Sequence, residues 1–167
     1  MHLEKDREFI RIIGWREWVS LPDFGIKFIK VKIDTGAGTS VLHASDIEFS
    51  TKNDTMWVRF VVHPEQRSSK NTKCVEAEVI EMRHIRSSSG HVTLRPVIRT
   101  HIKIGDKTWE IQLTLINRDI MGFRMLIGRE AIRKEYLVNP GRSYLQSHRR
   151  KKASSKKVKK TTKKALE

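Results

Sequence analysis

Apolar and polar residues alternate along most of the chain, and this pattern predicts β-strands rather than helices. The clearest alternation covers residues 97–104 and 108–115, and the Gly105-Asp106 pair between them predicts a hairpin. Because the same alternation recurs elsewhere, we expect a mainly β domain, in which a closed barrel is favoured over an open sheet. Further strands are predicted over 10–13, 15–19, 26–33, 56–62, 74–85 and 124–127.

Helical periodicity is confined to residues 129–136, which can form about two turns before 138–141 end the helix. Polar residues over 65–73 and 86–90 predict loops. One short helix near the end of the predicted barrel is therefore expected.

Composition divides the chain into three parts. Residues 1–8 form an N-terminal extension, 9–146 hold the predicted barrel, and 147–167 form a Lys/Arg-rich tail that we expect to be disordered. With 167 residues and 38% hydrophobic content, the chain is long enough for one domain with a core.

Positive charge is concentrated in the tail. The chain carries 34 Lys+Arg against 19 Asp+Glu, a net charge of +15, of which the tail from 148 to 167 supplies +9 and residues 1–147 supply +6. A polycation of this kind binds nucleic acid, ribosomes or acidic proteins without reading sequence, and a solubilising extension is the alternative. The residues expected to bind a polyanion are Arg149, Arg150, Lys151, Lys152, Lys156, Lys157, Lys159 and Lys160.

The sequence predicts a cytoplasmic protein without a membrane span. Cys74 is the only cysteine, so no intrachain disulfide can form. The N-terminus lacks the apolar run of a signal peptide, and no segment reaches the roughly 18 apolar residues of a membrane helix.

Residues 33–37, Ile-Asp-Thr-Gly-Ala, are the candidate for chemistry because they place a carboxylate directly after a predicted strand. Asp and Gly also make ordinary turns, so the motif alone leaves a turn and a catalytic loop open. In a catalytic loop, Asp34 would activate water as a general base while a second carboxyl polarises the scissile carbonyl. Two carboxyls in contact share one proton.

The chain contains a single Asp-Thr-Gly, so catalysis of this kind requires a homodimer with the two Asp34 side chains facing each other across a two-fold axis. Thr35 would then hydrogen-bond across the axis. Gly36 would let the backbone approach the substrate, because it carries no side chain.

A second segment strengthens this interpretation. Residues 33–43 and 124–132 together resemble the retropepsins, the retroviral-type aspartic peptidases, which combine apolar-Asp-Thr-Gly-Ala with a later apolar-apolar-Gly-Arg before a helix. The resemblance implies a retropepsin-like closed β-barrel with one short C-terminal helix. It also implies that the second segment supports the catalytic loop through Ala37, Ile127, Gly128 and Arg129. Plain strand-to-helix packing is the alternative for 126–128.

Two features depart from the retroviral pattern. Gly38 stands where retroviral enzymes carry an acidic residue, so Arg129 is expected to bond to Glu130 or to a main-chain carbonyl instead. The hairpin that closes over substrate in those enzymes has its best candidate in residues 80–92, with 87–90 as the tip, and a surface loop is the alternative.

The chain is also similar to a bacterial family labelled ATP-dependent zinc proteases, or RimK-associated proteases. The similarity is carried by residues 13–19, 32–37, 39–44, 95–97, 125–131 and 138–145. It covers about residues 10–145 and leaves out the tail. The association of this family with glutamate ligases that modify ribosomal proteins implies an acidic or glutamate-modified substrate.

The residues themselves predict neither a metal ion nor a cofactor. The chain has no His-Glu-x-x-His, no cysteine pair and no histidines at helical i, i+4 spacing, and it lacks a phosphate-binding Gly-x-x-x-x-Gly-Lys-Ser/Thr loop. His43 is a candidate for a hydrogen bond that supports the Asp34 loop from its second shell of neighbours.

The sequence thus predicts a homodimeric retropepsin-like aspartic endopeptidase that hydrolyses a peptide or protein substrate. Two alternatives stay open: a catalytically silent retropepsin-like module that the tail recruits to polyanions, and a zinc-dependent peptidase, as the family label suggests.

Overall fold

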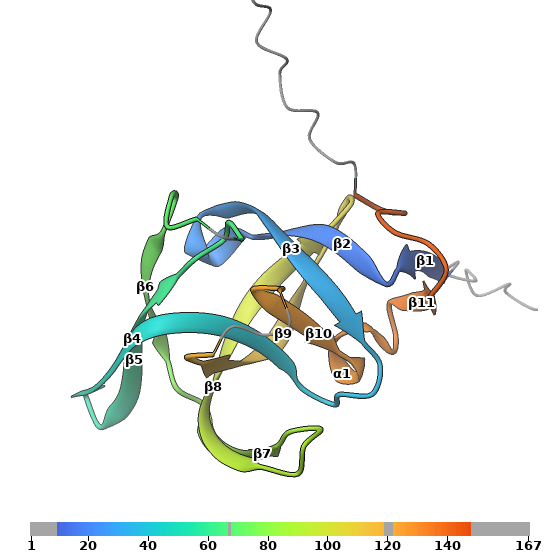
Figure 1. Cartoon of the computed structure of the whole chain (residues 1–167). Coiled ribbons are helices and arrows are strands. Elements are labelled where there is room, and N and C mark those ends of the chain that lie inside the picture. The colour runs from blue at the N-terminus through green and yellow to red at the C-terminus, as the bar shows by residue number, and fades with distance from the viewer. Residues whose placement is uncertain (1–9, 67, 119–121, 148–167) are drawn as a thin grey trace, which may run out of the picture.

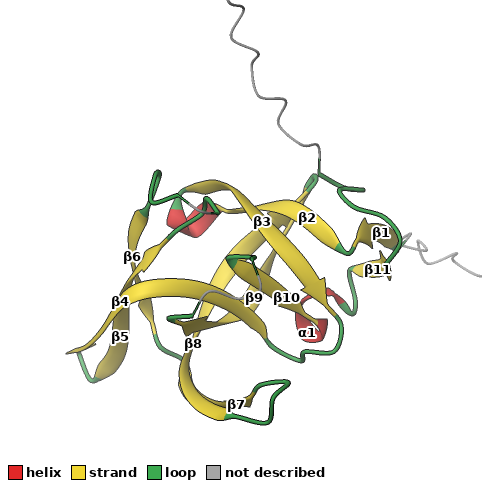
Figure 2. Cartoon of the chain, viewed as in Figure 1, coloured by secondary structure: helices red, strands yellow, loops and turns green. Residues whose placement is uncertain are grey.

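The computed structural model describes residues 10–66, 68–118 and 122–147, which form a mainly β architecture with little helix (Figures 1 and 2). The predicted polyanion-binding residues and the whole N-terminal extension, residues 1–8, lie outside the described residues. The strands are β1 (Arg11–Gly14), β2 (Arg16–Leu21), β3 (Ile26–Asp34), β4 (Ser40–Lys52), β5 (Thr55–Val62), β6 (Lys73–Glu78), β7 (Glu81–Arg86), β8 (Val92–Ile104), β9 (Lys107–Ile116), β10 (Met125–Gly128) and β11 (Tyr136–Asn139). The helical elements are the 3-10 turn η1 (Pro22–Phe24) and the helix α1 (Arg129–Ile132).

Strand pairing forms a ring in the order β10, β3, β2, β8, β9, β4 and back to β10. The pairing of β2 with β8 rests on one residue pair, Ser20 with Lys103, so the barrel is closed at a single point there. β5 and β6 extend the sheet beyond β4, and β7 extends it beyond β8. The expected mainly β, retropepsin-like class is confirmed, although the barrel is less completely closed than expected.

The core lies inside this ring, and the strands reach it by alternation. In β3, the side chains of Ile29, Val31 and Ile33 are buried, while the lysines between them are partly exposed. Leu42 of β4 and Leu113 of β9 are completely buried on the same inner side. Burial of such aliphatic side chains provides the main driving force for folding.

A buried carboxylate fastens the last described segment to β2. Glu17 is completely buried, and its Oε1 accepts hydrogen bonds from the backbone N–H of Gly14 and of Leu145, each at 2.8 Å. Its Oε2 accepts hydrogen bonds from the backbone N–H of Ser147, at 3.2 Å, and from the Ser147 hydroxyl. A buried charge needs such a complete set of donors.

Two predictions about elements were wrong, and one strand was not predicted. Residues 74–85 form two strands rather than one, because the backbone N–H groups of Val79 and Ile80 bond across to the carbonyls of Met56 and Val97. The predicted two-turn helix is only Arg129–Ile132, since Tyr136–Asn139 joins a parallel sheet with β1. No strand was predicted over β4, which is nevertheless among the longest in the fold.

Within the described residues, no helix has the length and apolar character needed to cross a membrane.

Candidate active site at the Asp34 loop

Asp34 is the last residue of β3, and β10 supports it from the side. The two strands are parallel, with Ile127 opposite Ile33 and Gly128 opposite Asp34. β10 also pairs antiparallel with β4, which leaves the loop on its other side. The loop from Thr35 to Thr39 therefore connects two strands that both pair with β10, as seen beside α1 in Figure 1.

The loop turns tightly around the Asp34 carboxylate. The backbone N–H of Gly36 donates to Asp34 Oδ1 at 3.2 Å, and the N–H of Ala37 donates to the Asp34 carbonyl at 3.2 Å. Asp34 is half-buried, whereas Thr35 and Gly36 are exposed. The carboxylate is thus oriented by its own turn and lies beside an accessible backbone segment.

Arg129 braces the loop through main-chain carbonyls. Its Nη1 donates to the carbonyl of Thr35 at 2.9 Å and lies 3.5 Å from the carbonyl of Gly36. Its backbone N–H donates to the carbonyl of Ala37 at 2.7 Å. The N–H of the next residue, Glu130, donates to the carbonyl of Gly38 at 3.1 Å. Backbone donors at the start of α1, which lack partners within a helix, are therefore satisfied by the loop.

Gly128 allows this close approach. A Cβ atom at this position would lie 2.6 Å from the carbonyl carbon of Thr39 and 2.7 Å from the Gly38 oxygen. The backbone N–H of Gly128 donates to Ser40 Oγ at 3.0 Å. Of the predicted support residues, Gly128 and Arg129 contact the Asp34 loop, Ala37 is part of the loop, and Ile127 lies opposite Ile33 in β3.

Sequence reasoning missed two buried hydroxyl residues that hold the far side of the loop. Ser40 accepts the Gly128 N–H through its side chain, and its carbonyl accepts a hydrogen bond from Thr114 Oγ1 at 3.0 Å. Both side chains are almost completely buried. The sequence signal that could have found them is a single Ser or Thr next to the apolar residues of a strand, as Ser40 is next to Val41 and Thr114 is between Leu113 and Leu115.

His43 lies at a distance from the carboxylate. Its backbone N–H donates to the carbonyl of Arg124 at 2.8 Å, and its ring centroid lies 5.9 Å from that of His63. In the strand ladders, His43 and Asp34 are displaced to opposite sides of the Val41–Leu126 pair, a separation of roughly 13 Å along the strands. The structure therefore does not bring His43 to Asp34.

The outer face of the sheet around Asp34 can be followed from strand to strand. Lys32 of β3 pairs with Leu126 of β10, which pairs with Val41 of β4. Val41 pairs with Thr114 of β9, and Thr114 pairs with Val97 of β8. Paired residues share a face, and residues two apart on a strand also share it. We call the side of the sheet that carries Asp34 and this row the Asp34 face; within the row, Leu126, Val41, Thr114 and Val97 are buried.

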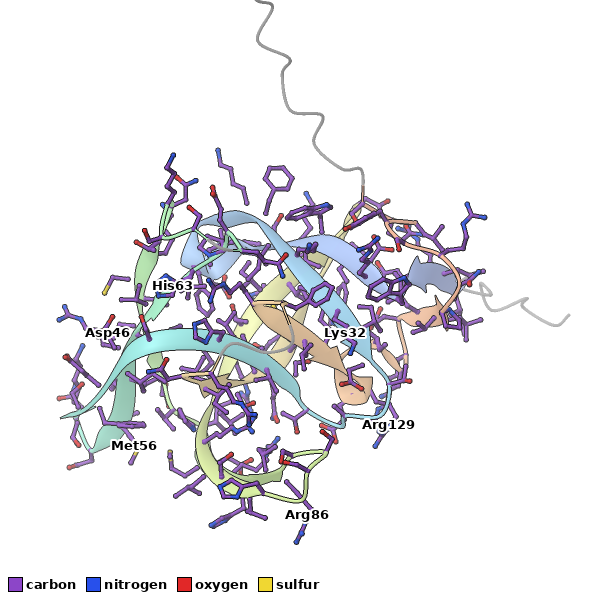
Figure 3. The ribbon with its side chains drawn as sticks, in the orientation of Figure 1. Lys32, Asp46, Met56, His63, Arg86 and Arg129 are labelled. Atoms are coloured by element: carbon purple, nitrogen blue, oxygen red, sulfur yellow. The ribbon has the colours of Figure 1, made fainter. Side chains whose placement is uncertain are left out.

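The segment proposed to close over substrate forms a hairpin. β7 pairs antiparallel with the first half of β8, and the backbone N–H of Ser87 donates to the His91 carbonyl at 2.8 Å at the tip. Arg83 of β7 donates to Gln112 Oε1 of β9 at 2.9 Å. Figure 3 shows Arg86 on this hairpin and Arg129 beside the loop that follows β3.

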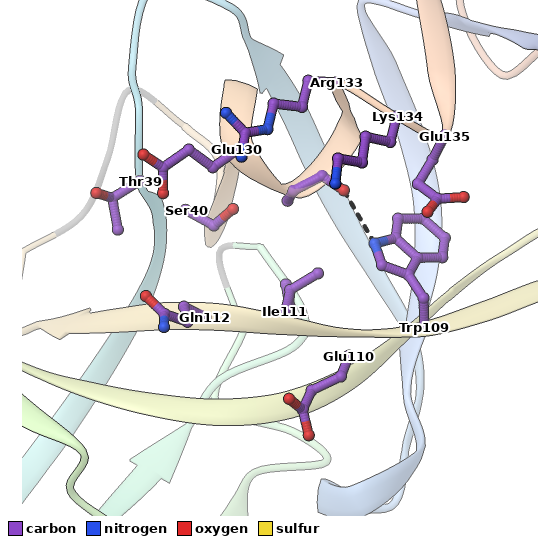
Figure 4. A pocket seen from close by; sticks show the side chains of 11 residues that line it. Thr39, Ser40, Trp109, Glu110, Ile111, Gln112, Glu130, Arg133, Lys134 and Glu135 are labelled. Carbon is purple, nitrogen blue, oxygen red and sulfur yellow. Dashed lines mark hydrogen bonds between the residues drawn. The ribbon is translucent and has the colours of Figure 1, made fainter.

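A cavity lies beside α1, next to the loop but not at the carboxylate. It has a volume of about 330 Å³ and is lined by residues of α1 and β9, including Glu130, Trp109 and Gln112 (Figure 4). Trp109 Nε1 donates to the carbonyl of Ala131 at 2.9 Å, which holds α1 against β9.

Metal ligands were not predicted from the sequence. Among the residues that the structure describes, no three His, Cys, Asp or Glu side chains lie close enough together to hold a metal ion.

Comparison with known proteins adds a family to this geometry. The RimB-like family, described as retropepsin-like aspartic endopeptidase RimB, matches residues 12–149. Two relatives are each named probable alpha-L-glutamate ligase. The one from Shewanella halifaxensis is 44% identical over 139 residues, which are 83% of this chain and 30% of the relative. The one from Desulfotalea psychrophila is 45% identical over 130 residues, 78% of this chain and 28% of the relative.

The chain thus spans less than a third of the length of these ligase relatives. Among solved structures, a Legionella pneumophila protein of unknown function, Lpg0085, is similar with a TM-score of 0.70 and 29% identity. That match covers 82% of this chain and 98% of the Legionella chain.

Proposed function

Because the chain belongs to the RimB-like family of retropepsin-like aspartic endopeptidases, we propose that it hydrolyses peptide bonds at a site formed by two copies of Asp34. The observation that carries this proposal is the support of the Asp34 turn by Gly128 and Arg129. An ordinary surface turn needs no strand beneath it and no arginine bonded to its carbonyls.

One copy supplies half of the chemistry. In the dimer, one Asp34 carboxylate takes a proton from water while the protonated partner polarises the scissile carbonyl. Thr35 is exposed next to Asp34, and only its carbonyl is engaged by Arg129, which leaves its hydroxyl in place to bond across the axis. Gly36 leaves room for the substrate backbone.

A candidate contact surface for the second copy lies near the loop. Ile12 of β1 and Leu137 of β11 pair with each other and are 48% and 58% exposed. β1 ends one residue before Trp15, whose carbonyl accepts the N–H of Ile33 at 2.8 Å. This apolar pair therefore lies at the same end of β3 as Asp34, where a second copy would have to approach.

We further propose that the substrate is an acidic, glutamate-bearing peptide or protein. Two observations support this choice. Residues 1–147 carry a net charge of +6, which attracts acidic partners. The relatives named probable alpha-L-glutamate ligase contain a segment similar to nearly all of this chain's described part. Binding of nucleic acid or a ribosome through the tail stays a prediction, as do the silent module and the zinc peptidase.

The test compares the wild type with Asp34→Asn on a library of peptides that includes acidic runs, across pH and with or without a chelator. Wild type should cleave, and Asp34→Asn should reduce kcat by about a thousandfold or more, since it removes a proton-transferring group. Asp54→Asn, in the exposed turn between β4 and β5, is the matched control and should behave as wild type. Cleavage that survives in Asp34→Asn, or that a chelator abolishes, would overturn the proposal.

A further inference from the structure

Within the described residues, Arg95 in β8 is a buried cation without an acidic partner. Its side chain is only 8% exposed, and within residues 10–66, 68–118 and 122–147 its one hydrogen bond runs from Nε to Thr93 Oγ1 at 2.8 Å. No carboxylate in this part of the chain lies within ion-pair distance of it. Arginine is almost never buried unless it is paired.

The nearest charges make this position less favourable still. Arg83 of β7 lies directly opposite Arg95 in the β7–β8 ladder, although Glu81 forms an ion pair with Arg83. Burial, and then the Arg118 cation, lower the pKa of Arg95 below its usual value. Like charges directly opposite each other across two strands are destabilising, and a buried charge without a partner is costly.

Arg95 lies on the Asp34 face. It is two residues from Val97 in β8, and the ladders join Val97 through Thr114 and Val41 to the β10–β3 pair. Because residues two apart on a strand share a face, Arg95 faces the same side of the sheet as Lys32 and Asp34. By these ladders Arg95 is level with His43 rather than with Asp34 and lies four strands from β3, so a bound substrate would have to extend over roughly 20 Å to reach both Asp34 and Arg95. Arg95 pairs with Arg83 in the β7–β8 hairpin, the segment that was expected to close over substrate.

Lys32 is a second cation that lies opposite another cation, and it is nearer to Asp34 than Arg95 is. It is half-buried, two residues before Asp34, and lies opposite Arg16 in the β2–β3 ladder. Figure 3 shows Lys32 alongside β10. Among the described residues, no carboxylate forms an ion pair with Lys32. Two positions on the Asp34 face therefore hold a cation beside another cation.

We propose that Arg95 and Lys32 are specificity-determining residues that bind carboxylate side chains of the substrate along the Asp34 face. The inference rests on the proposed peptidase function and adds to it the residues that select an acidic substrate. A guanidinium binds a carboxylate through two parallel hydrogen bonds, and both bonds strengthen when water is excluded. A substrate carboxylate at Arg95 would form the ion pair that no described carboxylate of the chain forms with it.

A binding experiment tests this assignment without cleavage. Full-length protein carrying Asp34→Asn is titrated into fluorescein-labelled hexa-L-glutamate, with labelled hexa-L-glutamine as the uncharged probe, and fluorescence anisotropy is read. Arg95→Gln, Arg95→Lys and Lys32→Gln are compared with Arg59→Gln. Arg59→Gln is the control because it also removes one positive charge. Arg59 lies exposed in β5, between Glu48 and Glu76. All variants keep the basic tail.

Arg95→Gln and Lys32→Gln should each weaken hexaglutamate binding by about tenfold or more, the loss expected for one charge-assisted hydrogen-bonded pair. Arg59→Gln should change binding by less than about twofold, as an exposed charge does. Arg95→Lys should retain part of the affinity. Hexaglutamine should bind weakly to every variant.

Equal effects of Arg95→Gln and Arg59→Gln would assign hexaglutamate binding to the tail and overturn the inference. Competition by an RNA oligonucleotide that depends on Arg95 would also overturn it, in favour of a nucleic-acid site. Thermal unfolding gives a separate readout, because loss of an unpaired buried charge should leave the Tm unchanged or raise it. A clear fall in the Tm of Arg95→Gln would instead indicate a structural role. Failure of Asp34-dependent cleavage would refute the peptidase but leave these binding results intact.

Discussion

Gly128 lies directly opposite Asp34 in the parallel ladder of β3 and β10, and no side chain fits between this glycine and the loop. Gly128 can therefore support the Asp34 loop because it has no side chain. Its backbone N–H bonds to Ser40, and the next residue, Arg129, bonds to the carbonyls of the loop. The loop and the start of α1 therefore form one hydrogen-bonded unit.

Gly128→Ala should displace this unit. The new Cβ would lie within 3.0 Å of backbone atoms of Gly38 and Thr39, which cannot rotate away. Overpacking of a buried site costs about 1–3 kcal/mol, and urea denaturation should show a loss of at least that size. Gly141→Ala is the control, because its Cβ would meet only the Asn139 side chain at 3.4 Å. Equal stability of the two variants would contradict the tight contact.

Arg129→Gln should reduce activity more than stability. The guanidinium is exposed, so loss of its bond to the Thr35 carbonyl should lower the free energy of unfolding by about 1.5 kcal/mol at most. A loop displaced by about 1 Å can lose roughly a hundredfold in rate, and kcat/KM should fall accordingly. Arg133→Gln, directly after the end of α1, should leave kcat/KM unchanged. An equal loss of kcat/KM in both variants would show that Arg129 does not position the Asp34 loop.

Much of this site could be predicted from the sequence because its parts are local. The Asp34 turn and the β10–α1 segment each have a recognisable run of residues, and their similarity to one fold placed them together. β4 was missed because its second half, after Ala44, is mostly polar and exposed. That half becomes a strand only through pairing with β5, after a shift in register near Asp46.

Other features could not be predicted because they depend on contacts between distant segments. The predicted helix over 129–136 ends early because β11, which begins at Tyr136, pairs with β1, a contact between distant segments. Arg95 is one of many arginines in the sequence. Only the register of β8 shows that it is buried beside other cations on the face that carries Asp34.

Glu17→Ala should destabilise the fold strongly. The substitution would leave the backbone N–H groups of Gly14, Leu145 and Ser147 without their acceptor. Each buried donor without a partner costs about 1–3 kcal/mol, so the free energy of unfolding should fall by at least about 3 kcal/mol. Glu110→Ala, at an exposed position of β9, should change it by less than about 0.5 kcal/mol. A small decrease in the free energy of unfolding for Glu17→Ala would mean that water accepts these hydrogen bonds in place of the carboxylate.

Acid should weaken the fold through Asp23. Hydrogen bonding of its carboxylate to the backbone N–H of His101 lowers its pKa below the ordinary value. A group whose pKa is lower in the folded state stabilises the fold above its unfolded pKa, and this contribution is lost as pH falls through the folded value. Asp23→Asn should therefore narrow the difference in Tm between about pH 6 and pH 3. An unchanged difference would exclude Asp23 as a source of the acid dependence.

Leu137→Asp should separate the proposed dimer and abolish cleavage together. Leu137 is 58% exposed and pairs with Ile12 on the apolar surface beside the Asp34 end of β3. Burial of a leucine contributes about 1.5–3 kcal/mol, so its replacement by a charge should raise the dimer dissociation constant by tenfold or more. Sedimentation velocity measures the association, and Phe49→Asp, 51% exposed in β4, is the matched control. Cleavage by Leu137→Asp should return as protein concentration rises, because two Asp34 side chains are needed for one site. Full cleavage by a protein that sediments as a monomer would refute the shared site.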